Sequence, residues 1–198
     1  MKEYLVSPQT LWGEISVAAV EESPWFFVPG IHMTAQLCYN EDNLFVRMQA
    51  VEEEIRAELN SQTDMICQDS CMEFFFAPKE GDRRYFNVEM NLNAMVYLGY
   101  GTVREERVRL LVKEPDILFD THAHRTDDGW VLTYRIPASL IRRFFPEFRG
   151  FYPGLTMRAN FMKCGDLTRQ PHYLMWNSST SPAPDFHRYD DFGLLRFV

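Results

Sequence analysis

Amide and carboxylate side chains alternate with apolar ones along residues 85–93. Successive side chains on a β-strand point to opposite faces, so this alternation predicts a strand with one apolar and one polar face. The predicted polar face carries Tyr85, Asn87, Glu89, Asn91 and Asn93. Amides and carboxylates make paired donor and acceptor contacts to the hydroxyl groups of a sugar. The alternative interpretation is a solvated outer face with cross-strand ion pairs.

A second carboxylate, Glu73, lies in the aromatic run at residues 71–76. A turn with Pro78 and Gly81 joins this run to residues 85–93, and the pattern predicts a β-hairpin. Glu73 and Glu89 could then face each other, and two carboxylates about 5–10 Å apart are what a glycoside hydrolase uses. Hydrolysis therefore stays an alternative function. No nucleophile elbow, phosphate-binding glycine loop or metalloprotease motif is present, and no catalytic residue is assigned.

About ten short strand-like runs follow one another along the chain, separated by turn signals such as Asp127-Asp128-Gly129. Residues 138–145 predict one or two helical turns, residues 51–59 fit either a short helix or a charged strand end, and residues 117–125 are interpreted as a strand. The pattern predicts an all-β fold, an antiparallel β-sandwich like an immunoglobulin or jelly-roll domain. No repeat or linker divides the chain, so residues 1–198 are expected to form a single domain.

Acidic residues outnumber basic ones, and the chain of 198 residues has a formal net charge of −8. Nucleic acids and anionic membranes attract basic surfaces, so neither is expected as a partner. No apolar run reaches the length of a membrane span, and the N-terminus has no signal-peptide pattern. A cytoplasmic location is therefore expected, unless a leader has been removed. The composition leaves the oligomeric state open.

Cysteine and histidine are sparse. The four cysteines, which form no C-x-x-C pair and are predicted to be free thiols, are Cys38, Cys67, Cys71 and Cys164. His122 and His124 lie two residues apart, so both side chains share one face of the predicted strand. That spacing is compatible with a metal pair, but exposed histidines without a metal are the preferred interpretation.

Four stretches of the chain resemble carbohydrate-binding module family 9 and the related sandwich domains of the DOMON type. They are YNEDNLFVRMQAVEE (39–53), CQDSCMEFFFAP (67–78), GWVLTYRIPASLI (129–141), and TMRANFMKCGD (156–166) with the C-terminal segment 172–198. In this order they extend over most of the chain. The resemblance implies a β-sandwich that binds a polysaccharide or oligosaccharide without cleaving it.

In family 9 the end of a sugar chain is clamped between two tryptophan rings. By position, Trp176 matches one ring and Glu73 matches the carboxylate of the site. Cys67 stands where the second tryptophan would be, and Trp25 or Tyr97 are the candidates for a substitute ring.

The predicted ligand is thus a carbohydrate, stacked on an aromatic ring and held by amide, carboxylate and arginine side chains. The predicted binding residues are Trp176, Glu73, Asn87, Glu89, Asn91, Arg158, Asn160 and His172. No cofactor is expected, although the resemblance makes structural calcium possible and the metal content stays open. Haem binding is a further alternative, because DOMON relatives can bind haem through methionine and histidine.

Overall fold

The computed structural model describes residues 1–198 as thirteen β-strands with two short α-helices and three 3-10 helices. The strands are β1 (Glu3–Pro8), β2 (Ala18–Val20), β3 (His32–Tyr39), β4 (Asn43–Val51), β5 (Cys71–Ala77), β6 (Tyr85–Asn91), β7 (Val96–Gly101), β8 (Val108–Leu110), β9 (His122–Arg125), β10 (Gly129–Pro137), β11 (Thr156–Cys164), β12 (Tyr173–Met175) and β13 (Gly193–Phe197). The helices are α1 (Pro115–Phe119), α2 (Ala138–Arg142), η1 (Trp12–Glu14), η2 (Ile66–Gln68) and η3 (Tyr189–Asp191).

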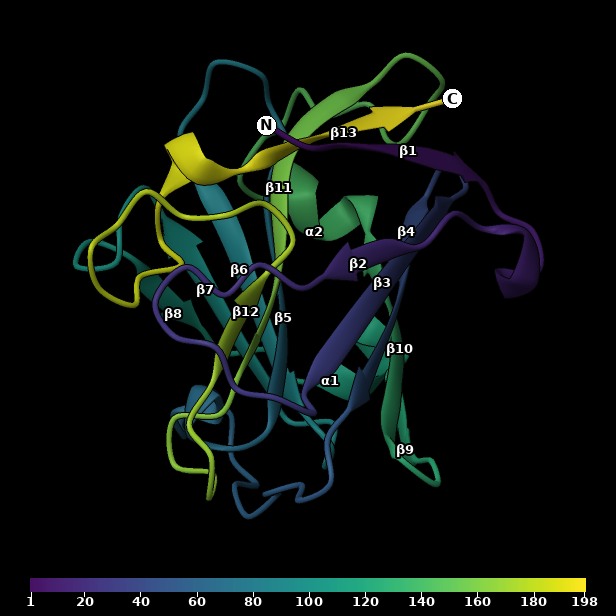
Figure 1. Cartoon of the computed structure of the whole chain (residues 1–198). Helices are drawn as coiled ribbons and strands as arrows, with labels where there is room; N and C mark the ends of the chain where they lie inside the picture. The colour runs from purple at the N-terminus through teal and green to yellow at the C-terminus, as the bar shows by residue number, and fades with distance from the viewer.

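The strands form two facing layers that β1 joins (Figure 1). One layer has the order β8-β7-β6-β5-β11-β13, and the other has the order β3-β4-β10-β9. Residues 3–6 of β1 pair with β13 and residues 7–8 pair with β3, in both cases in parallel. Every other strand pair is antiparallel. The predicted antiparallel β-sandwich is confirmed, with β1 as a parallel exception and more strands than the ten expected.

Alternate side chains of both layers meet in the main apolar core. Aromatic rings cross it in a row from β11 to β6: Phe161 stacks on Phe74 at 5.0 Å, Phe74 on Phe76 at 5.2 Å, and Phe76 on Phe86 at 5.2 Å between ring centroids. The opposite layer contributes core side chains from β10, among them the fully buried Trp130. The apolar side chains that alternate along each strand therefore face the core, as the sequence predicts.

A second apolar cluster covers the outer face of the β5–β6 layer. Its side chains include Phe75, Tyr85 and Phe192, whose rings pack against one another. The segments 52–70 and 177–192 lie over this face, and every residue of β5 and β6 is buried. The polar side of β6 is consequently neither a solvated face nor an open platform.

The interpretation of residues 51–59 as a helix is wrong, because the chain is irregular between β4 and η2. The buried carboxylate of Asp69 accepts hydrogen bonds from the backbone N–H groups of Glu58 and Leu59, each at 2.9 Å. Arg56 pairs with the same carboxylate. Tertiary partners thus satisfy backbone donors that the local sequence would otherwise offer to a helix.

The prediction of one strand over residues 117–125 is also wrong, because this stretch divides between α1 and β9. Pro115 begins the helix at a position where its missing N–H group is not needed. Asp120, with φ at 49°, ends it in the left-handed conformation.

The predicted helical turn after residue 137 is confirmed as α2, and all four cysteines are free thiols. None of the helices is long and apolar enough to cross a membrane.

Candidate functional site

The register of β5 and β6 places Glu73 directly opposite Glu89. Side chains that face each other across an antiparallel pair lie about 4.5–5.5 Å apart at Cβ. Both carboxyl groups are on the outer face of the layer, and each residue is only 3% exposed. They line a cavity of about 170 Å³ together with Cys67 and Cys164. The hairpin therefore brings two acidic side chains to one enclosed site.

Burial raises the pKa of both carboxyl groups. The pKa of Glu73 is well above its usual range because the group is desolvated and lies beside Glu89. Burial raises the pKa of Glu89 to about 7, against the opposing effects of the Arg107 charge and a hydrogen bond from Asn87. Two neighbouring buried carboxyl groups do not readily ionise together, so the pair retains a proton near neutral pH. It can then both donate and accept hydrogen bonds.

Asn87 orients one member of this pair. Its Nδ2 donates to Glu89 Oε1 at 2.7 Å, and the side chain is fully buried. Its Oδ1 has no hydrogen-bond partner and lies against Gly99 on β7. A Cβ atom at position 99 would lie 2.0 Å from that oxygen, so glycine is what leaves room for the amide.

Tyr173 and Phe186 form an aromatic wall of the cavity. Their ring centroids are 6.0 Å apart. Trp25 packs against both, at 6.0 Å from Tyr173 and 5.7 Å from Phe186, and its Nε1 donates to the backbone oxygen of Ser181 at 3.0 Å. An aromatic wall beside convergent polar groups is an arrangement that binds the apolar face of a sugar ring.

Two arginines from the loop between β7 and β8 also line the cavity. Arg107 Nη1 donates to the backbone oxygen of Arg104 at 3.2 Å, and Arg104 Nη2 lies 3.1 Å from Asp185 Oδ1. His187 lies nearby, and burial together with the two arginine charges lowers its pKa to about 2, so its ring is neutral. The fixed positive charges of the site are therefore the two guanidinium groups.

The structure contradicts the prediction that Trp176 stacks on a ligand. The residue is 4% exposed and belongs to the main core, where its ring lies 5.6 Å from that of Phe161. A Cβ atom at Gly193 would lie 2.4 Å from the indole, so β13 closes over it. Trp176 follows β12, and its N–H group donates to the backbone oxygen of Phe161 on β11, which brings the side chain to the inner layer.

Asn160 and Asn91, two of the predicted binding residues, are instead fully buried, and both anchor loops. Asn160 Nδ2 donates to the backbone oxygen of Asn177 at 2.8 Å, and its Oδ1 accepts from that residue's N–H group at 2.9 Å. Asn91 Nδ2 donates to the backbone oxygen of Leu59 and to Asp69 Oδ2, each at 2.9 Å. These amides hold the two segments that cover the site.

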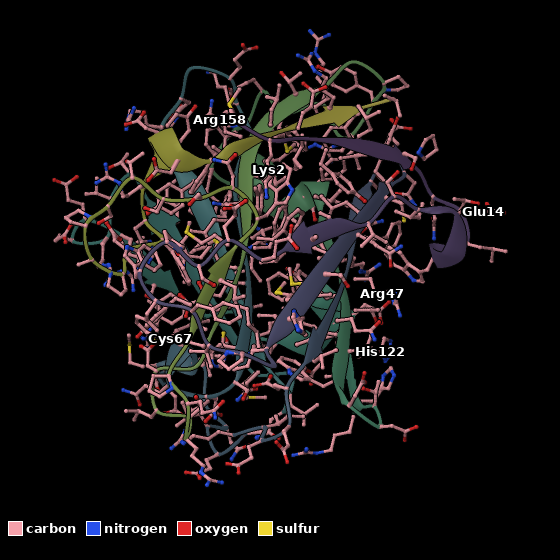
Figure 2. The ribbon with its side chains drawn as sticks, viewed as in Figure 1. Lys2, Glu14, Arg47, Cys67, His122 and Arg158 are labelled. Carbon is pink, nitrogen blue, oxygen red and sulfur yellow. The ribbon has the colours of Figure 1, made fainter.

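Arg158 lies at the other end of the same face. Its guanidinium packs over the ring of Tyr189 at 5.5 Å and donates to the backbone oxygen of Asp190 at 3.2 Å. Figure 2 shows Arg158 near the top of the molecule and the cavity residue Cys67 at its lower left. Arg158 is therefore not part of the cavity.

His172 belongs to a different buried group, here named the Lys163 cluster: Lys163, Glu52, His172, Trp130 and Ser70. Lys163 Nζ lies 2.8 Å from His172 Nε2 and 3.1 Å from Glu52 Oε1. Trp130 Nε1 and Ser70 Oγ donate to the two oxygens of Glu52 at 2.6 and 2.8 Å. Burial and the Lys163 charge lower the pKa of His172 to about 4.

Of the eight predicted binding residues, the cavity is lined by Glu73 and Glu89, with Asn87 behind them. Sequence reasoning missed the lining residues Arg104, Arg107, Asp166, Tyr173, Asp185 and Phe186. They come from loops and from β12, where no periodicity marks the direction of a side chain. Tyr173 lies an odd number of residues from Trp176, so the two face opposite sides, and the burial of Trp176 in the structure is what assigns Tyr173 to the outer face. His122 and His124 are exposed on β9, away from this site.

Comparisons with known proteins agree with this fold. The family model of carbohydrate-binding family 9 matches residues 2–197, and no curated protein matches the chain. A solved structure of a candidate carbohydrate-binding protein from Bacteroides uniformis ATCC 8492 is similar over 100% of this chain and 99% of its own, with 24% identity and a TM-score of 0.85.

Two structures from Caldicellulosiruptor kristjanssonii are also similar. A family 9 module in complex with glucose covers 100% of this chain and 96% of its own, with 14% identity and a TM-score of 0.70. A family 9 module in complex with cellotriose covers 99% and 93%, with 14% identity and a TM-score of 0.69. At these identities the solved structures establish the shared fold, while the family model extends over nearly every residue. The chain belongs to carbohydrate-binding family 9.

Proposed function

We propose that the protein binds carbohydrate without cleaving it, and that the Glu73–Glu89 cavity takes one sugar residue at the end of a chain. One observation carries the proposal: two buried carboxyl groups, two arginines and an aromatic wall meet in a single cavity. Its volume of about 170 Å³ is below the roughly 300–1,000 Å³ of pockets for drug-sized ligands. That size favours a single ring over a longer segment.

Each part of the cavity has a role towards such a ring. Tyr173, which is partly exposed, offers an aromatic face for the C–H groups of the sugar. Because at least one of the two carboxyl groups keeps its proton near neutral pH, the pair can donate to one hydroxyl and accept from another. Arg107 supplies donors to hydroxyl oxygens from the loop side. Membership of a carbohydrate-binding family, and the glucose and cellotriose complexes of similar structures, support this assignment.

The placement of the two carboxyl groups favours binding over hydrolysis. Glycosidases hold their carboxyl groups on the two sides of the scissile bond. Glu73 and Glu89 are instead direct neighbours on one sheet face, so both approach a ligand from the same side. We therefore expect no release of reducing ends when the protein is incubated with cello-oligosaccharides.

Isothermal titration with glucose and cellotriose tests the proposal. Tyr173→Ala and Arg107→Ala should each weaken binding by about tenfold, the equivalent of about 1.4 kcal/mol. The matched control is Tyr152→Ala, because Tyr152 is exposed and lines a larger hollow of about 870 Å³ to which none of the predicted binding residues contributes. Control affinity equal to wild type is expected. The proposal is wrong if wild-type protein binds no sugar, or if Tyr152→Ala abolishes binding while Tyr173→Ala leaves it intact.

A further inference from the structure

We infer that Cys71, Cys164 and Glu73 form a binding site for a zinc-class cation, one that prefers thiolate ligands. No property of the sugar site is needed for this inference, although the two sites share Glu73. It rests on where the sheet register places three ligand atoms, on the access to them from solvent, and on the absence of any other cation bonded to them.

The register places the two thiols together. Cys71 on β5 is directly opposite Cys164 on β11, and both are fully buried on the outer face of the layer. Glu73 lies two residues beyond Cys71 and therefore on the same face. Cys164 Sγ lies 2.9 Å from Glu73 Oε1. The two sulfur atoms and a carboxylate oxygen all lie within 4.8 Å of one another.

These separations are close to those of a tetrahedral site. Zinc binds sulfur at about 2.3 Å and carboxylate oxygen at about 2.0–2.2 Å, which puts neighbouring ligand atoms roughly 3.5–3.8 Å apart. Side-chain rotations of three residues can supply the remaining ångström without moving the paired strands. Three protein ligands leave a fourth position, and Cys67 on η2 lies close enough for its backbone oxygen to accept from Cys164 Sγ at 3.6 Å.

An ion can reach this position. Glu73, Cys164 and Cys67 all line the same cavity, and Cys67 is partly exposed. The fourth coordination position is therefore open to Cys67 or to a water molecule in the cavity. Because the cavity leads to the ligand atoms, the cation can bind without local unfolding of the protein.

The donor set selects the class of cation. Soft thiolates prefer zinc-class ions, whereas calcium prefers six to eight oxygen ligands. The only hydrogen bond made by Glu73 is the one from Cys164, and neither lysine nor arginine donates to it. Burial raises the pKa of Cys71 to about 12 and that of Cys164 well above its usual range, so both thiols are protonated without metal. Binding would replace the two thiol protons and the proton of the Glu73 carboxyl group where it is bound, and all of them are released to solvent.

Titration of the reduced, chelator-treated protein with Co²⁺ tests the inference, since Co²⁺ bound to thiolate gives an intense near-ultraviolet charge-transfer band. We expect one equivalent of Co²⁺ to saturate that band and Zn²⁺ to abolish it. Cys71→Ser and Cys164→Ser should weaken Zn²⁺ binding by more than the roughly 10–100-fold seen for loss of an outer-sphere partner. Cys38→Ser is the matched control, because Cys38 is equally buried but lies on β3, in the other layer, and it should bind as wild type does.

A second measurement needs no variant and holds if a serine variant fails to fold. X-ray absorption at the zinc edge should show two sulfur neighbours at about 2.3 Å and oxygen at about 2.0 Å. A first shell of oxygen and nitrogen alone overturns the inference, as does the absence of any charge-transfer band in wild-type protein. Sugar titrations carried out in chelator are independent of this result, so the two proposals can fail separately.

Discussion

Two buried groups of ionisable side chains lie on opposite faces of the β11 layer, and they differ in how their charges are matched. In the Lys163 cluster, both oxygens of Glu52 and the lysine nitrogen have partners of suitable sign. At the cavity, Glu73 and Glu89 face each other as like groups, and Asn87 Oδ1 has no partner at all. Both groups are buried, so what distinguishes the cavity from the Lys163 cluster is the incomplete pairing of its polar atoms.

Of the changes considered, removing the charge of Lys163 from the Lys163 cluster should lower the free energy of unfolding the most. Lys163→Met leaves Glu52 buried without its counter-charge, and breaking a buried pair typically destabilises a protein by about 3–5 kcal/mol. The control is Lys79→Met, because Lys79 pairs with Glu147 on the surface, with side chains 51% and 55% exposed, and such pairs contribute roughly 0–1 kcal/mol. Urea unfolding measures both. If both variants lose the same free energy of unfolding, the Lys163 cluster contributes no more to stability than an exposed ion pair does.

Replacing the ionisable Glu89 at the cavity by a neutral glutamine should instead stabilise the protein, and the gain should be seen only at higher pH. The pKa of Glu89 is about 7 in the folded chain, against about 4.3 for a free glutamate. The folded state therefore binds the extra proton between these values, so wild-type stability falls as pH rises through that window, by about 4 kcal/mol in all. Glu89→Gln keeps an oxygen for Asn87 but has no proton to lose.

The free energy of unfolding of Glu89→Gln and wild type should thus agree near pH 4 and diverge towards pH 8, with the variant more stable. Glu21→Gln is the control, because Glu21 is exposed, and its curve should follow wild type throughout. Parallel pH curves for Glu89→Gln and wild type would mean that burial does not raise the free energy of the ionised carboxyl pair. The proposed difference in charge matching between the cavity and the Lys163 cluster would then be wrong.

The sandwich and the pairing of the acidic residues were predictable because alternation along a strand fixes the face of every side chain. Residues 85–91 carry this pattern without interruption, and the register turned it into the Glu73–Glu89 pair. Helix α1 was missed because a five-residue helix is too short to show a period of its own.

The rest of the site could not be predicted in the same way. Arg104, Arg107, Asp185 and Phe186 come from loops, and tertiary contacts rather than periodicity decide where loop side chains point. Trp176 was wrongly predicted to line the site. The residue type suits stacking on a sugar, but its position beyond β12 places it under Gly193 in the core. Residue type alone suggested an aromatic ring, and the topology places Tyr173 and Phe186, not Trp176, at the cavity.

The most direct test of the central claim is a crystal structure of the protein with cellotriose. The account predicts one terminal glucose residue in the cavity, with its hydroxyl groups within hydrogen-bonding distance of Glu73 or Glu89 and its ring against Tyr173. Sugar bound at Tyr152 or elsewhere on the surface, with an empty cavity between β5, β6 and the covering loops, would contradict it.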